Sequence, residues 1–327
     1  MWLRTWLLTA FLVVMVLGAA ELAWRSQGHR ASVVDDLDLW SEQRAQIYGG
    51  ETTVVLIGTS RIQLGFVSDV FHDRFPRHRL VRLEAPLRHP VSALRNLAED
   101  RAFRGVVIAS VAIPWMRKGV YPDLSEELDH YRDHYDWNAR GNRRIASFVQ
   151  SRLVSVNPNV NLRDVLVRWA RRGEWPDPLH VVTKADRSRA GDFSLHPDLK
   201  RSRKNLVFIT KERERLHHVS SEAMLEQLVE LDALAERIRE RGGNVVFVRL
   251  PSSGKIRRID EKYYPKREYW DRFAARTTAP TLHFLDVPTL ADFECADGLH
   301  LDQRDAPRFT ALLLDELMRM QIFGPPG

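Results

Sequence analysis

Five short apolar segments recur along the chain and constrain its fold more than any other feature. Each is apolar at successive positions, so a strand formed by it is expected to be buried on both faces. Helix-like segments separate most of them, which is typical of a parallel sheet covered by helices on both sides. Right-handed crossovers then give an α/β fold, a three-layer α/β/α sandwich with a mainly parallel sheet. The five segments are 52–58, 78–84, 105–113, 244–250 and 281–286.

Four segments around these strands are expected to be helices. The clearest has an apolar stripe at helical spacing and is followed by Gly242 and Gly243, a common helix ending. A proline favours the start of another, at Pro90. The expected helices are 39–47, 90–100, 220–243 and 305–321.

The amino terminus carries an uncharged apolar run from Trp6 to Ala20, which continues briefly after Glu21. Its total of about 19 apolar residues is near the length needed to cross a bilayer. Two interpretations stay open. Residues 1–25 are an uncleaved membrane anchor, or a signal peptide whose Gly-Ala-Ala at 18–20 offers small residues to a peptidase. In both cases the rest of the chain is expected to be exported.

The chain after this segment is expected to form a linker with a short helix, 26–50, and one large domain, 51–327. Within that domain, residues 115–205 interrupt the alternation of strands and helices. This insertion is basic, has scattered aromatic residues, and is expected to contain short helices at about 142–155 and 161–171. It either caps the sheet with a solvated charged surface, or forms a lid or docking surface for an anionic glycan or lipid.

Composition excludes several classes of function. The 327 residues carry a formal net charge of +6, a mild excess that fits an anionic surface but does not argue for nucleic acid. No zinc-ligand spacing, Walker loop or Gly-x-Gly-x-x-Gly occurs, so neither metal nor cofactor is expected. The single cysteine, Cys295, permits no intramolecular disulfide.

The first strand segment ends in Gly58-Thr59-Ser60-Arg61. In parallel sheets, sites form beyond the carboxyl ends of the strands, so Ser60 stands where a nucleophile is expected. The same residues also make an ordinary turn and helix N-cap. A serine hydroxyl needs a neighbouring base, and that base needs an orienting acid.

Asp297 and His300 supply both partners, in the loop between the last strand segment and the last helix. With this spacing, Asp297 can bond one imidazole nitrogen while the other faces Ser60. Alternatively, the motif is a plain loop that leads into a helix. Further candidates for oxyanion or substrate contacts are Arg61, Ser252 and Ser253, although Pro-Ser-Ser-Gly is also a common loop sequence.

Together, Gly-Thr-Ser-Arg after the first strand and Asp-Gly-Leu-His before the last helix resemble the first and last blocks of the SGNH (GDSL-type) hydrolase superfamily. The order and placement agree over residues 52–320. The resemblance implies a flavodoxin-like sandwich with Ser60 as nucleophile, His300 as base and Asp297 as its orienting acid. With the anchor, the chain also resembles the envelope branch that includes alginate O-acetylation and teichoic acid D-alanyl transfer proteins.

Two features of that superfamily are missing. Its second block carries an oxyanion glycine, but residues 83–97 contain none, and the asparagine of its third block has no counterpart after 106–115. Losing one oxyanion donor typically lowers a rate about 10²- to 10³-fold.

The expected function is therefore an anchored acyl-ester hydrolase or O-acyltransferase, acting on acylated envelope carbohydrate or another ester. The anchor would lie in the inner (cytoplasmic) membrane with the domain on the extracytoplasmic side, and a multi-pass O-acyltransferase is a candidate partner. A rival expectation is a catalytically weakened binding or assembly module of a polysaccharide modification or export system. A lipid-directed esterase is a third.

Overall fold

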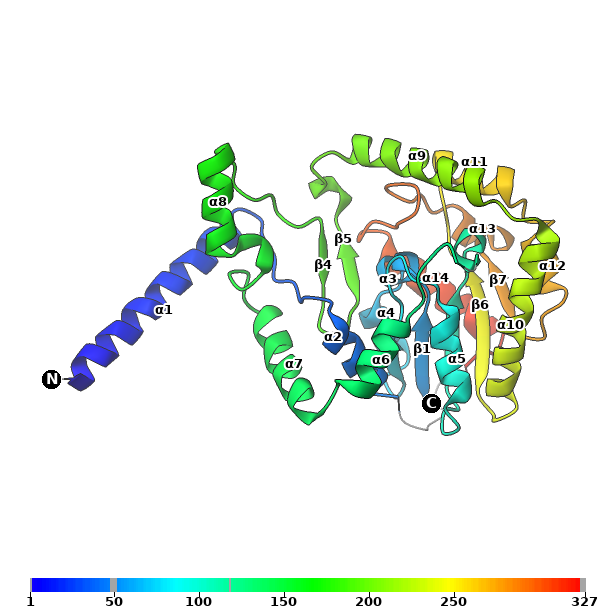
Figure 1. Cartoon of the computed structure of the whole chain (residues 1–327), viewed down its shortest axis with the longest axis horizontal. Helices are drawn as coiled ribbons and strands as arrows, with labels where there is room; N and C mark the ends of the chain where they lie inside the picture. The colour runs from blue at the N-terminus through cyan, green and yellow to red at the C-terminus, as the bar shows by residue number, and fades with distance from the viewer. Residues whose placement is uncertain (1, 48–51, 118, 324–327) are drawn as a thin grey trace.

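The computed structural model describes residues 2–47, 52–117 and 119–323. Residues 48–50 of the expected linker, the expected domain start at 51, and residues 324–327 lie outside that description. The main sheet has five parallel strands in the order β2-β1-β3-β6-β7 (Figure 1). Counted along this sheet, the order is 2-1-3-4-5, the flavodoxin-like arrangement. The strands are β1 (Thr53–Ile57), β2 (Arg79–Arg82), β3 (Val106–Ser110), β6 (Asn244–Arg249) and β7 (Thr281–His283).

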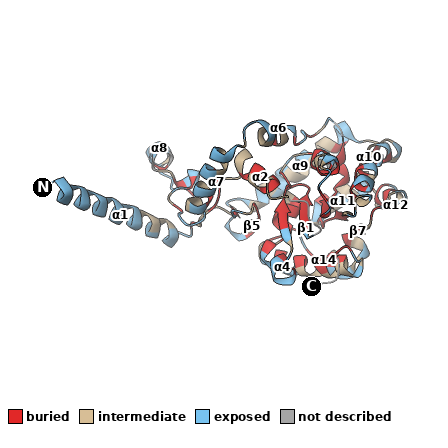
Figure 2. Cartoon of the chain, turned by 90° about the horizontal axis from the view of Figure 1, so that it is seen from below, coloured by how far each residue is buried: buried red, intermediate tan, exposed pale blue. Residues whose placement is uncertain are grey.

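Helices cover both faces of this sheet because successive strand residues point to opposite sides. Val55 and Ile57 of β1 contribute to one apolar core, and Val54 and Leu56 to the other. The buried residues concentrate along the strands and the inner sides of these helices (Figure 2). The first core includes α5 (Val91–Glu99), α10 (Ser221–Arg239) and α12 (Trp270–Ala274); the second includes α3 (Ser60–Gly65), α4 (Ser68–Arg74), α13 (Pro288–Ala291) and α14 (Ala306–Arg319). The predicted three-layer sandwich is confirmed.

The insertion contains the two expected helices and further elements. One of the expected pair, α7, starts before residue 142 because Asp136 caps it by accepting the amides of Asn138 and Ala139. A two-stranded antiparallel sheet was not expected, since three-residue strands are too short to show alternation. The insertion's helices and strands are α6 (Ser125–Asp133), α7 (Trp137–Gln150), α8 (Leu162–Arg172), β4 (Val181–Thr183) and β5 (Arg189–Gly191). The next helix, α9 (Leu199–His217), begins in the insertion and continues past its expected end at residue 205.

The amino-terminal helix α1 (Trp2–Ser26) projects from the rest of the molecule (Figure 1). It has no buried residue and is long and apolar enough to cross a membrane. An extended segment then runs along the insertion, where the Val33 amide donates to the Thr183 carbonyl, and leads to α2 (Leu37–Arg44). The elements not yet named are α11 (Gly254–Tyr263) and the 3₁₀ turns Ile113–Met116, Pro158–Val160, Phe193–Leu195 and Phe284–Asp286.

Candidate active site

The turn after β1 requires glycine at its first position. Gly58 has φ 146°, and a Cβ there would lie 2.8 Å from the Cβ of Ser110 on the neighbouring strand. Thr59 is the N-cap of α3, accepting from the Arg61 amide, and Ser60 is the first residue of the helix. The capping role therefore belongs to Thr59, which leaves the Ser60 hydroxyl available for another partner.

That partner is the imidazole of His300. Ser60 Oγ lies 2.8 Å from His300 Nε2, and His300 Nδ1 lies 2.7 Å from Asp297 Oδ2. The other carboxylate oxygen of Asp297 accepts the amides of Leu299 and His300, which holds the loop in a tight turn. The structure thus joins the three residues of the expected triad in one chain of hydrogen bonds.

The negative charge of Asp297 orients the hydrogen bonds between these three side chains. Burial alone would raise the pKa of Asp297, but the bonds from the His300 ring and the two loop amides outweigh it and lower the pKa to about 2. An ionised Asp297 keeps the ring proton on Nδ1, so Nε2 carries a lone pair and accepts from the Ser60 hydroxyl. This arrangement can remove the serine proton when the hydroxyl attacks an electrophile.

The insertion contributes Phe193, which the sequence did not single out. Its ring lies parallel to the His300 ring with centroids 6.5 Å apart, and its amide donates to Asp302. Two insertion histidines, His180 and His196, lie close to each other, 4.6 Å between centroids. Burial, with His196 nearby, lowers the pKa of His180. The His180 ring lies 6.2 Å from the Phe193 ring, measured between centroids, which places the pair near the triad. No motif marks these residues, because only the fold brings them to the site.

Arg61 does not serve as the expected oxyanion donor in this geometry. Its side chain is buried, and one guanidinium nitrogen donates to the carbonyl oxygens of Leu250 and Pro251. Burial, with Arg249 nearby, lowers the pKa of Arg61 to about 9. The residue ties α3 to the loop after β6, and its sequence position beside Ser60 gave no sign of this inward direction.

Ser252 and Ser253 also hold loops. The Ser252 hydroxyl donates to Asp260, and the Ser253 hydroxyl accepts the amide of Cys295 at 2.7 Å. The Ser253 amide donates to the carbonyl of Gly298, so the loops after β6 and β7 are joined beneath Asp297. Ser253 therefore positions the triad loop through backbone contacts, whereas Ser252 bonds a side chain of α11.

The loop after β2 contains no glycine but has an unusual backbone conformation at Leu87. Leu87 adopts φ 59°, the left-handed region that glycine normally occupies. The start of this loop lies beside the turn that carries Ser60, because the Ala85 amide donates to the Gly58 carbonyl. Within the described part of the chain, the Leu87 amide has no hydrogen-bond partner. A non-glycine residue thus keeps a glycine-like backbone at this edge of the sheet.

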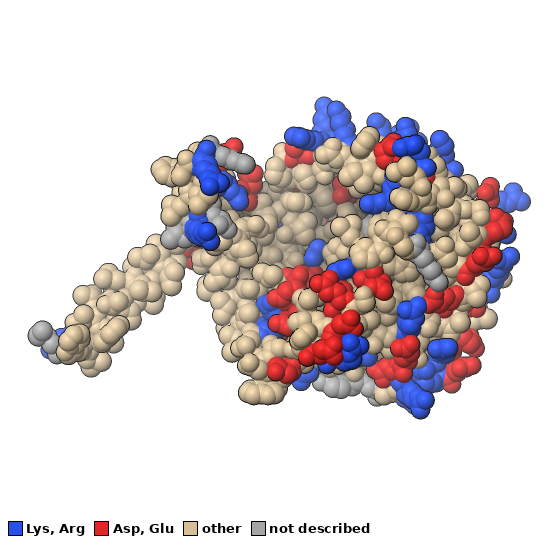
Figure 3. All heavy atoms as spheres, in the orientation of Figure 1, with Lys and Arg blue, Asp and Glu red and all other residues tan. Residues whose placement is uncertain are grey.

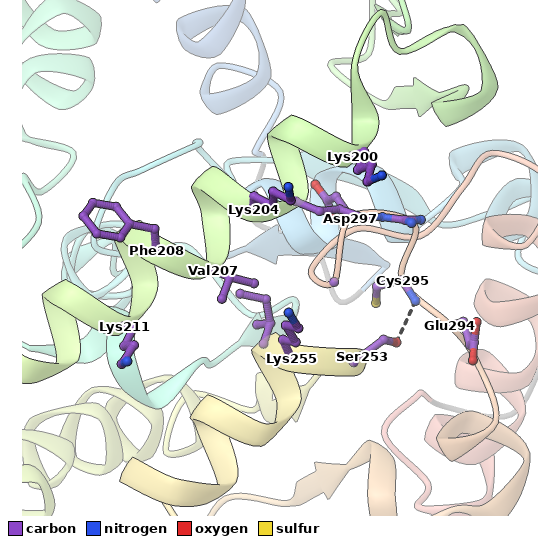
Figure 4. A pocket seen from close by; sticks show the side chains of 14 residues that line it. Lys200, Lys204, Val207, Phe208, Lys211, Ser253, Lys255, Glu294, Cys295 and Asp297 are labelled. Atoms are coloured by element: carbon purple, nitrogen blue, oxygen red, sulfur yellow. Dashed lines mark hydrogen bonds between the residues drawn. The ribbon is translucent and has the colours of Figure 1, made fainter.

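A pocket of about 640 Å³ adjoins the triad loop, between α9 and the start of α11 (Figure 4). Asp297 lies in its wall, whereas Ser60 and His300 do not line it. Cations and apolar side chains alternate around it: Lys200, Arg203, Lys204, Lys211 and Lys255 with Val207, Phe208 and Ile256. Among the described residues no carboxylate pairs with the four lysines, so the pocket suits an anionic group attached to a less polar body.

Metal binding has no support from the described residues, where no three histidine, cysteine, aspartate or glutamate side chains gather as a ligand set.

Comparison with known proteins adds little to this geometry. No family model matches the sequence, and no curated protein matches it. Among solved structures, the chain is similar to the crystal structure of TesA, with 14% identity and a TM-score of 0.37 over 82% of this chain and 99% of that one. A TM-score this low carries no argument, so the fold class rests on the strand order.

Proposed function

We propose that this protein is a serine acyl-ester hydrolase or O-acyltransferase whose triad is Ser60, His300 and Asp297. The observation that carries the proposal is the continuous hydrogen-bond chain from the serine hydroxyl through the imidazole to a half-buried, ionised carboxylate. A serine that served only as a helix cap would not need this chain, and Thr59 already fills that role.

The proposed reaction follows from the atoms in place. Ser60 Oγ attacks the ester carbonyl while its proton moves to His300 Nε2. The same proton then passes to the departing alcohol, which leaves an acyl-serine. Water or a sugar hydroxyl, deprotonated by Nε2, then attacks the acyl carbon. The bond from that carbon to Ser60 Oγ breaks, the proton passes from Nε2 back to Oγ, and the acid or the new sugar ester is released. The amides of Ser60 and Leu87 are the candidate donors to the oxyanion, since Arg61 is committed to backbone carbonyls.

The proposed substrate is an acylated carbohydrate that carries negative charge. Four unpaired lysines around an open, partly apolar pocket beside Asp297 support this class. The long apolar α1 supports a single-pass membrane anchor. Our proposal puts this anchor in the cytoplasmic membrane and the domain on the extracytoplasmic side. A multi-pass O-acyltransferase remains the candidate partner for transfer.

A serine-directed fluorophosphonate probe tests this proposal on the full chain in membranes. The native protein should label, and Ser60→Ala should abolish labelling. His300→Ala should nearly abolish it, and Asp297→Asn should reduce it less completely, because the base remains but loses its orienting partner. Ser151→Ala, which changes an exposed serine, is the matched control and should label as the native protein does.

The outcomes separate the alternatives. Labelling without hydrolysis of a model acetyl ester would favour transfer to a specific acceptor. A folded protein that never labels would contradict the enzymatic proposal and favour a binding or assembly module.

A further inference from the structure

Helix α7 is amphipathic, with its apolar side turned outward. Trp137, Ile145 and Phe148 share one face and are 85%, 67% and 59% exposed. The opposite face packs toward α2 with Arg143 and Ser147 buried. A surface helix in water normally buries its apolar side. The reversed arrangement indicates that a nonaqueous partner covers the outer face of α7.

The surrounding segment has the composition of a membrane interface. Of the 15 exposed large apolar side chains outside α1 in the described chain, nine fall within residues 137–175. The same segment holds eight arginines against two acidic residues, Asp164 and Glu174. Basic side chains gather over α8 beside the end of α1 (Figure 3). Tryptophan with arginine on an amphipathic helix is typical of contact with an anionic lipid surface.

Hydrogen bonds join this segment to the end of α1. The Glu21 carboxylate accepts the amides of Val154 and Ser155, each at 2.9 Å, and the Ser155 hydroxyl at 3.0 Å. Arg25 pairs with Glu21 and donates to the Arg152 carbonyl. The loop after α7 is therefore fixed to the last turns of α1.

A contact between two aromatic rings joins the segment after α8 to the last turn of α1. Trp24 meets Trp175 edge to face, with 6.0 Å between ring centroids. Trp175 lies just beyond the carboxyl end of α8. The last turn of α1 therefore contacts the insertion both after α7 and after α8.

The position of these contacts along α1 indicates what covers the outer face of α7. Glu21 ends the uncharged run of α1, so it marks the level where a spanning helix leaves the hydrocarbon. The loop bonded to it, and the end of α7 just before that loop, lie at the same level. In Figure 1, α7 and α8 flank the point where α1 joins the domain, whereas α9 lies along the top of the sandwich, away from that point.

We propose that α7 and α8 lie on the bilayer that α1 crosses. The apolar side chains of α7 occupy the boundary between headgroups and acyl chains, and the arginines contact anionic phospholipid headgroups. This inference rests on the membrane anchor of the proposed function and is independent of the triad. It assigns the insertion a role as a second membrane contact that fixes the orientation of the domain.

The test uses the full chain in nanodiscs of phosphatidylglycerol and phosphatidylethanolamine, with a polarity-sensitive fluorophore at Phe148→Cys. The matched control carries the fluorophore at Val229→Cys, an exposed apolar position on α10. The native Cys295 stays unlabelled because burial raises the pKa of its thiol to about 11. A lipid-borne spin label should quench the probe at 148 at least about threefold more than the probe at 229, and aqueous iodide should do the reverse.

Three results would overturn the inference. Equal quenching at both positions, in protein that resists an alkaline carbonate wash, would overturn the membrane contact but leave the anchor in place. Release by carbonate would overturn the anchor and the inference together, without touching the triad. Protection of the 148 probe in the nanodiscs from both the lipid-borne spin label and iodide would show that protein covers this face. Weaker lipid quenching in phosphatidylcholine discs is the result expected if the arginines contact anionic headgroups.

Discussion

The ring of Phe193 lies parallel to the ring of His300, although one belongs to the insertion and the other to the last loop of the sandwich. Asp302 holds the Phe193 amide and follows His300 by two residues, so both rings are positioned from the same loop. The insertion is therefore part of the site and not merely a cover over the sheet.

Replacing Phe193 by leucine should have a large effect on the labelling rate of Ser60 and a small effect on the free energy of unfolding. Leucine keeps most of the buried apolar volume, so the free energy of unfolding should fall by less than about 1.5 kcal/mol. The fluorophosphonate labelling rate should fall at least about fivefold, because His300 loses the flat surface that limits its motion. Phe148→Leu, at an exposed position on α7, is the control and should change neither quantity. An unchanged labelling rate would show that Phe193 contributes to packing and does not affect His300.

Gly58→Ala should destabilise the protein and disturb Ser60 together. The added Cβ would meet Ser110 at 2.8 Å, on backbone that L residues rarely adopt. We expect a loss of at least about 2 kcal/mol in the free energy of unfolding, measured by urea titration. Gly141→Ala is the matched control, since open space surrounds that helical glycine. It should stabilise α7 by about 0.5–1 kcal/mol.

Leu87 should tolerate glycine better than valine. Its backbone is left-handed, and its side chain is exposed, so glycine removes steric strain at little cost in buried surface. A β-branched residue worsens that strain. Leu87→Gly should be more stable than Leu87→Val by about 1–2 kcal/mol in chemical unfolding. Equal stability of the two variants would show that the loop relaxes to another conformation.

Asp297 should make stability depend on pH in the acid range. Its folded pKa of about 2 lies below the ordinary value of 3.8, so the carboxylate stabilises the fold above the ordinary value. That contribution, about 2 kcal/mol, should be lost as pH falls from about 4 through 2. Urea titrations at pH 5 and pH 2.5 should show it, and Asp297→Asn should remove this part of the difference. An identical pH dependence in the variant would contradict the assignment.

The sheet could be predicted because its strands are apolar on both faces. Val54 and Val55 pack into different cores, and only a doubly covered strand allows that. The last strand is shorter than expected. Its sequence stays apolar beyond His283, but the His283 ring accepts the Leu285 amide and turns the chain into a 3₁₀ turn. Such a side-chain contact leaves no mark in hydrophobic periodicity.

The site was only partly predictable. Ser60, Asp297 and His300 could be singled out because each follows a strand and their chemistry is complementary. Side-chain direction could not be read in the same way. Arg61 turns inward to carbonyls 189 and 190 residues away in sequence, and Phe193 comes from an insertion without a motif. The left-handed backbone of Leu87 is equally invisible in a sequence that has no glycine in this loop.

The hydrogen bond between Ser60 and His300 joins residues 240 positions apart, near opposite ends of the chain. At a synthesis rate of about 5–20 residues per second, the serine emerges about 12–50 seconds before its base. Throughout that interval its hydroxyl is an ordinary alcohol, because nothing nearby can take its proton. A nascent or truncated chain is therefore inert toward esters, and activity can begin only when the last loop has closed over the first turn.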